Sequence, residues 1–107
     1  MNGRSTQKIA LLGIPRDVDA LRKALEARGY EVRLLSPGLD DSSAADIVSS
    51  SQMAVSIGVA SVSFGSKTIE ALVQLTRSGR RSMFLPEPLP PTSMSSFVAA
   101  LEKLLSE

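Results

Sequence analysis

The chain has 107 residues, which is enough for one domain with a single core but too few for two such domains. Hydrophobic residues make up 43% and charged residues 21%, and the formal net charge of +1 does not favour binding to nucleic acid or to an anionic membrane. Cysteine and histidine are both absent, which excludes disulfides, thiolate nucleophiles, cysteine-ligated metals and the usual general base at neutral pH.

The apolar runs of the chain are short. None approaches the roughly 20 residues that a membrane helix needs, and the run at residues 9–14 stops at Pro15, before it reaches signal-peptide length. Aromatic residues are only 4% of the chain, which disfavours a stacking platform for nucleic-acid bases. We therefore expect a cytoplasmic protein that contacts neither membrane nor nucleic acid and carries no cofactor or metal.

Four short runs of apolar residues predict four strands. Residues 9–14 and 53–59 are apolar almost throughout, which is typical of strands buried on both faces of a parallel sheet. Residues 31–35 alternate polar and apolar side chains and suit a strand nearer the sheet edge. Residues 82–85 form the fourth expected strand.

Helical spacing of apolar residues follows each expected strand. Asp17 is the expected cap of the first helix, and Gly29 is its expected C-terminal stop. Residues 40–43 offer several caps for a short second helix. The third helix should end at Gly79, and its expected buried face is formed by Ile69, Leu72, Val73 and Thr76.

The last helix follows a proline-rich connector at residues 86–91. Thr92 or Ser93 is its expected cap. Its expected buried stripe consists of Met94, Phe97, Leu101 and Leu104, with Val98 and Leu105 beside it.

This alternation of strands and helices predicts an α/β fold: a three-layer, flavodoxin-like open parallel sheet of about four strands in the order 2-1-3-4. Residues 1–8 would be a flexible N-terminal segment and residues 9–107 a single domain. In such sheets, ligands bind at the carboxyl ends of the strands, where the winding direction reverses. Here that point lies between the first and third strands, beside residues 13–17 and 59–67.

The loop after the third strand resembles the end of a phosphate-binding P-loop. However, six residues separate Gly58 from Gly65, and Ser66 precedes Lys67, so the Walker A spacing is not met. Two interpretations stay open: the helix start holds an anion, or Ser66 merely caps the helix while Lys67 lies in solvent. The candidate ligand-binding residues of the two loops are Gly13, Gly58, Ser61, Ser63, Gly65, Ser66 and Lys67.

Glu70 follows Ser66 by one helical turn. A carboxylate at this place could act as the nucleophile, or stabilise the oxocarbenium ion, in cleavage of an N-glycosidic bond. The alternative is an exposed glutamate that complements the helix dipole. A basic cluster of Arg77, Arg80 and Arg81 closes the same helix and is interpreted as a solvated face.

The two ends of the chain resemble bacterial response-regulator receiver domains. The segment KIALLGIPRDVDALRKALEARGYEV is similar to their opening, and FLPEPLPP followed by SFVAALEKLLSE is similar to their closing strand, turn and helix. The functional residues of that family are not matched: residues 13–15 replace the acidic pair, no aspartate stands near Gly58, and Glu87 replaces the lysine before proline. The resemblance implies a degenerate receiver that lacks one strand–helix unit, does not take phosphate in the usual way and works through protein contacts.

The middle of the chain resembles a different group. The segments ADIVSSSQMAVSIGV and SKTIEALVQLTRSGRRSMFL are similar to TIR-like and nucleoside deoxyribosyltransferase-like folds, in which a serine-containing loop leads to a helix with a catalytic glutamate. This resemblance implies a catalytic role for Glu70, together with Ser66.

The leading functional expectation is a non-enzymatic, receiver-like signalling or assembly module. Its last helix and residues 82–91 would contact a protein partner or a second copy, with Phe84, Glu87 and Leu89 at the contact. The first alternative is an enzyme that cleaves an N-glycosidic bond of a nucleotide with Glu70. The second alternative is a sensor of a small ligand or nucleotide that uses residues 59–67.

Overall fold

The computed structural model describes residues 7–36, 38–58 and 64–106. The elements are β1 (Lys8–Leu12), α1 (Pro15–Ala27), β2 (Glu31–Leu35), α2 (Asp41–Ser49), β3 (Met53–Ile57), α3 (Ser66–Arg77), β4 (Arg81–Leu85) and α4 (Pro91–Leu105). The strands of this part of the chain form one parallel sheet in the order β2-β1-β3-β4. The expected α/β class, open parallel sheet and strand order are confirmed.

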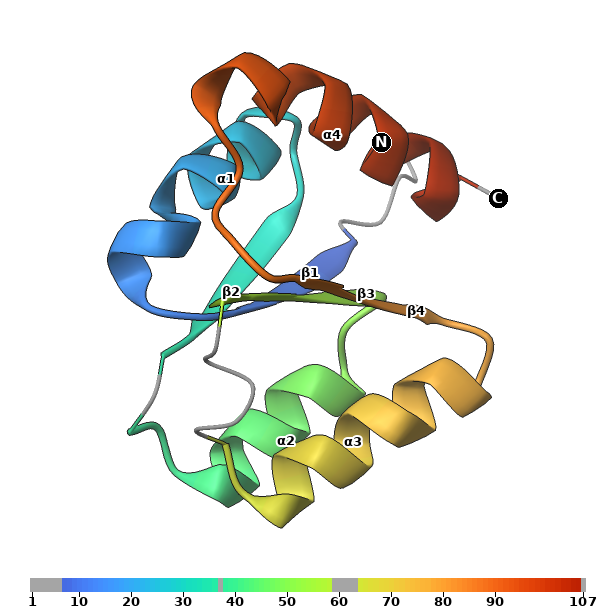
Figure 1. The fold of residues 1–107 in the computed structure, drawn as a ribbon. Coiled ribbons are helices and arrows are strands. Elements are labelled where there is room, and N and C mark those ends of the chain that lie inside the picture. Colours follow the sequence, from blue (N-terminus) through green and yellow to red (C-terminus); the bar gives the residue numbers. More distant parts are fainter. Residues whose placement is uncertain (1–6, 37, 59–63, 107) are drawn as a thin grey trace.

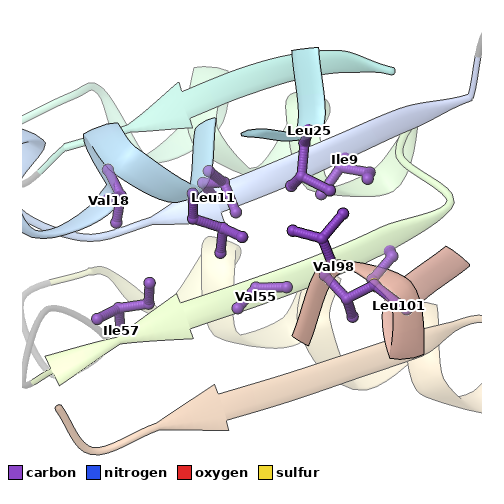
Figure 2. Packing of buried hydrophobic residues seen from close by; sticks show 10 residues of the cluster. Ile9, Leu11, Val18, Leu25, Val55, Ile57, Val98 and Leu101 are labelled. Atoms are coloured by element: carbon purple, nitrogen blue, oxygen red, sulfur yellow. The ribbon is translucent and has the colours of Figure 1, made fainter. Parts of the chain in front are cut away.

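The helices form one layer on each face of the sheet. Helices α1 and α4 cover one face, and α2 and α3 cover the other (Figure 1). The α1–α4 side holds the bulkier core, in which side chains of both helices and of the central strands point toward one another (Figure 2). Its buried residues are Ile9, Leu11, Val18, Leu21, Leu25, Met53, Val55, Ile57, Val98 and Leu101.

The core under α2 and α3 includes two small residues from the central strands. Ala10 of β1 and Ala54 of β3 face the two helices there. The helices contribute Ala44 and Val48 from α2 and Ala71 and Leu75 from α3. Leu12 and Leu35 complete the strand contribution, and α2 and α3 also pack extensively on each other.

The start of α1 differs from the expectation. The helix begins at Pro15 with Ile14 at the N-cap, so Asp17 lies in the first turn and not at the cap. Proline has no N–H to satisfy and its φ already suits the first helical position, which explains the earlier start. The expected stop is confirmed, since Gly29 has a φ of +93° directly after the cap residue Arg28.

The start of α4 differs for the same reason. The helix begins at Pro91 with Pro90 at the N-cap, so the expectation of a cap at Thr92 or Ser93 is wrong. Val98, expected beside the buried stripe, is fully buried. Neither α4 nor any other helix within the described ranges is long and apolar enough to cross a membrane.

Helix α3 buries a different face from the expected one. Its buried residues are Thr68, Ala71 and Leu75. Ile69 and Val73 are each 47% exposed, Leu72 is half-buried, and Thr76 is exposed. The expected buried face is therefore wrong for these residues apart from Leu72. The reason is that α3 packs sideways on α2 as well as on the sheet, which turns its small residues inward and leaves the larger ones toward the outer edge.

Candidate functional site

Two glycines lie at the predicted mouth, where β1 and β3 end. Gly13 is buried, and its amide donates to the Leu35 carbonyl at 3.1 Å. A Cβ atom there would lie 2.7 Å from Cγ1 of Val18, so close packing of α1 requires this glycine. Gly58 has a φ of +73°, which favours glycine for its backbone conformation. Both glycines thus have structural reasons for their identity, and their expected ligand role stays a prediction.

The start of α3 is occupied by a carboxylate from the neighbouring helix. Asp41, in the first turn of α2, accepts hydrogen bonds from the backbone N–H groups of Lys67 and Thr68, both at 3.0 Å. It also accepts the Thr68 hydroxyl at 2.7 Å. These hydrogen bonds, foremost that of the Thr68 hydroxyl, lower the pKa of Asp41 below its usual value. The chain therefore supplies its own anion where the sequence suggests a phosphate.

The residues around this cap fit the carboxylate closely. A Cβ atom on Gly65 would lie 2.5 Å from Cγ of Asp41, so only glycine leaves room for the carboxyl group. Gly65 is the N-cap of α3 and Ser66 is its first residue, so the interpretation of Ser66 as the cap is wrong. The Lys67 ammonium lies 3.0 Å from the Ser42 hydroxyl, which adds a second link between the two helix starts.

Ser61 and Ser63 lie outside the described residues. The ligand roles of Gly65, Ser66 and Lys67 stay predictions, although two N–H groups that an anion would use are already donated to Asp41.

Ser66 and Glu70 lie on the exposed side of α3. Ala71 and Leu75 mark the side that packs on the sheet and on α2. Glu70 and Ser66 project well away from that side, because successive helical residues are rotated by about 100°. Both are exposed, and neither side chain makes a hydrogen bond or ion pair with any residue in the described part of the chain. Their placement gives no support to a catalytic pair inside the mouth.

The outer side of β4 and α3 carries the largest exposed apolar side chains of this half of the molecule. Phe84 of β4 is 55% exposed, and Ile69 and Val73 of α3 are each 47% exposed. Ser82 of β4 lies on the same sheet face as Phe84, and its hydroxyl oxygen is 3.1 Å from that of Thr76 on α3. We call the surface formed by Ile69, Val73, Phe84 and the outer side of β4 the β4–α3 edge.

The two edges of the sheet differ in character. At the β2 edge, Glu31 and Arg33 face the α2–α3 side and form an ion pair at 3.5 Å. Such charges block pairing with a further strand. At the equivalent face of the β4 edge stand Ser82 and Phe84, which are uncharged, and the charged residue of this strand, Arg81, lies on the α1–α4 face. Strand β4 pairs only with β3 in the described part of the chain, so its outer side is open to another strand.

The residues expected to contact a partner are accessible. Phe84 and Glu87 are exposed, and Leu89 is half-buried. Their contact role stays a prediction, but the missed residues Ile69 and Val73 extend the same surface onto α3. Their i, i+4 spacing indicates one apolar helix face, but the spacing alone does not distinguish a face packed on the core from one at an exposed edge.

A hollow of about 200 Å³ lies at the opposite end of the sheet, at the amino ends of the strands. It is lined by Gln7, Gln52, Gly79, Arg80, Arg81, Leu104 and Leu105. Arg80 is committed to structural hydrogen bonds there, since its guanidinium donates to the carbonyls of Ser49 and Ser51, both at 2.8 Å. The hollow is thus far from the mouth where parallel sheets bind ligands.

No family model, no curated protein and no solved structure matches the chain.

Proposed function

We propose that this chain is a receiver-like signalling or assembly module without enzymatic activity, which acts by binding another protein at the β4–α3 edge. The observation that carries the proposal is that Phe84 is 55% exposed and lies on β4, whose outer side pairs with no other strand among the described residues. A large exposed aromatic side chain on an edge strand is typical of a surface that another chain covers.

The energetics favour a partner that uses both the side chains and the strand. A fully covered phenylalanine buries roughly 200 Å², so covering the exposed part of Phe84 contributes on the order of 2 kcal/mol. Ile69 and Val73 add roughly 1 kcal/mol each. Association itself costs at least about 4 kcal/mol, so these three residues need help from backbone hydrogen bonds to β4.

The two alternative functions receive less support. The enzymatic alternative needs Glu70 in a sheltered site, and its side chain is exposed on the outer side of α3. The ligand-sensing alternative needs free N–H groups at the start of α3, and those of Lys67 and Thr68 already bind Asp41.

A photo-crosslinking residue at position 84 tests the proposal in living cells. Position 33 is the matched control, because Arg33 occupies the same sheet face at the opposite edge. We expect discrete crosslinked products from position 84 that disappear when Val73→Lys is added, and none from position 33. If position 84 gives no more product than position 33, the proposal is wrong.

A further inference from the structure

Strand β4 can pair with a copy of itself. Its five residues are centred on Met83. In an antiparallel pair related by a two-fold axis through this point, Met83 faces Met83 of the second copy, and Ser82 faces Phe84 of the second copy. The side chains of facing residues lie on the same sheet face, so the α2–α3 layers of the two copies become continuous.

The contact between Thr76 and Ser82 places α3 relative to this axis. One residue along β4, from Ser82 to Met83, advances about 3.3 Å. Because α3 runs in the opposite direction, the same advance takes about two helical residues at 1.5 Å each, counted back from Thr76. The two-fold axis through Met83 therefore lies beside α3 at the level of Val73 and Gln74.

The spacing of the layers also fits. Helix α3 overlies β3 and β4, since Leu75 packs in one cluster with Ala54 of β3 and Thr76 contacts Ser82 of β4. Helices that pack side by side lie about 10 Å apart, which is about two strand spacings of 4.8 Å. Pairing β4 with its copy brings the two α3 helices to this distance in antiparallel orientation, where Val73 would be covered.

The charges of α3 are complementary to those of a reversed copy. Glu70 and Arg77 are exposed, lie two turns apart along one stripe, and flank the axis on either side. Reversal of the helix brings Glu70 of one copy opposite Arg77 of the other, twice in the dimer. Within one chain the two side chains are separated by about 10 Å of helix, too far for an ion pair.

From this self-complementarity we infer that the partner at the β4–α3 edge is a second copy of this chain, joined by antiparallel β4 pairing and by reciprocal contacts between Glu70 and Arg77. The inference rests on the proposed function, because it names the occupant of the same surface. It predicts a symmetric dimer with one continuous eight-stranded sheet, made of the four strands of each copy.

Charge reversal on purified full-length chain tests the pairing. Glu70→Arg gives a copy with two positive charges at these positions, and Arg77→Glu gives a copy with two negative charges. We expect the wild type to sediment as a concentration-dependent dimer, and each variant to dimerise about tenfold or more weakly, since like charges then meet twice. An equimolar mixture of the two variants restores both contacts and forms a heterodimer with near wild-type affinity.

A matched pair of reversals controls for net charge. Asp46→Arg on α2 and Lys103→Glu on α4 change exposed charges away from the axis, so each should dimerise like the wild type. Circular dichroism of all variants confirms that they are folded. A dimer that ignores the Glu70 and Arg77 reversals, or variants that do not recombine on mixing, would overturn the inference.

The outcome is also separable from that of the proposed function. The chain could be monomeric at millimolar concentration while position 84 still forms crosslinked products in cells whose mass is not twice that of the chain. In that case the inference of a second copy is wrong, and the proposal of a binding surface at the β4–α3 edge is supported. If the chain is monomeric and position 84 gives no crosslink, both are wrong.

Discussion

Thr68 donates its hydroxyl to the carboxylate of Asp41 at 2.7 Å, and the backbone N–H of Thr68 donates to the same oxygen at 3.0 Å. A residue in the first turn of α2 thereby caps the start of α3. Thr68 is fully buried, so this contact fixes the two parallel helices to each other at the ends nearest the mouth of the sheet. The cap explains why Gly65 must be a glycine and why an external anion would have to displace Asp41.

The first prediction concerns the pH dependence of this cap. An aspartate ordinarily has a pKa of 3.8, and in the folded protein the hydrogen bonds hold the pKa of Asp41 below this value. The folded state therefore binds the Asp41 proton less readily than the unfolded chain does. The contribution to stability is fully present above about pH 3.8 and is lost as the pH falls through the lowered pKa. We expect Asp41→Asn to lower the urea midpoint at pH 7, and the difference from wild type to vanish in strong acid.

Urea titrations between neutral and strongly acidic pH measure this difference. Asp46→Asn is the control, because Asp46 is exposed on the same helix and its side chain accepts no hydrogen bond from the described residues. A gap between Asp41→Asn and wild type that persists unchanged in acid would contradict the linkage.

The second prediction concerns the space beside the cap. Gly65 has a φ of −80°, so alanine suits its backbone, and any cost of Gly65→Ala comes from the contact with Asp41. We expect a loss of about 1–3 kcal/mol in the free energy of unfolding. In the Asp41→Ala background the added methyl group has room, so the cost should largely disappear in a double-mutant cycle. Ser66→Ala is the control: Ser66 is the next residue and is exposed, so its change should have little effect. If the effects of Gly65→Ala and Asp41→Ala are additive, the proposed contact between the two residues is wrong.

The strands and their order were predictable because their patterns are local. Continuous apolar runs at residues 9–14 and 53–59 indicate buried strands, and short crossovers leave few topologies for a parallel sheet. Gly29 and Gly79 also ended their helices as expected, at φ values of +93° and +88°. The helix starts at Pro15 and Pro91 differ from the expected ones because proline suits the first helical position even where polar cap residues follow it.

The cap and the exposed edge were not predictable in the same way. Helix α3 has two apolar faces, and its packing on α2 decides which of them is buried. The sequence of α3 alone does not show that α2 is its neighbour. The residues Asp41 and Thr68 are 27 positions apart, and their contact requires that both helices begin at one end of the sheet. The parallel topology implies that the two helix starts are close. The sequence does not show, however, whether Asp40 or Asp41 caps α3. In the structure Asp40 caps its own helix by accepting from Ser43, and Asp41 caps α3.

The third prediction concerns Arg80, which ties the end of α2 to the start of β3. Its guanidinium donates to the carbonyls of Ser49 and Ser51 and to the hydroxyl of Ser78. These carbonyls lie where α2 has ended and need a donor from outside the helix. We expect Arg80→Ala to cost about 2 kcal/mol in the free energy of unfolding. Both carbonyls accept from one guanidinium nitrogen, Nη1, while Nε donates to Ser78. Arg80→Lys keeps the charge but has no second nitrogen for Ser78, so its urea midpoint should fall between those of alanine and wild type.

The last prediction separates the β4–α3 edge from the core. Val73 is 47% exposed, and Leu75, two residues on, is completely buried. At concentrations where the chain is monomeric, Val73→Lys should change the free energy of unfolding by no more than about 0.5 kcal/mol, because the lysine extends into water. Leu75→Lys buries an unpaired charge under α3 and should prevent folding.

Urea denaturation followed by circular dichroism measures both variants. The contrast matters because an apolar residue that the fold does not need, beside Phe84 on an open strand, is left without a structural reason for its identity. If Val73→Lys destabilises the monomer by several kcal/mol, Val73 belongs to the core, and loss of binding in that variant could no longer be assigned to the edge. If it is neutral, the same substitution becomes a clean probe of association through β4 and α3.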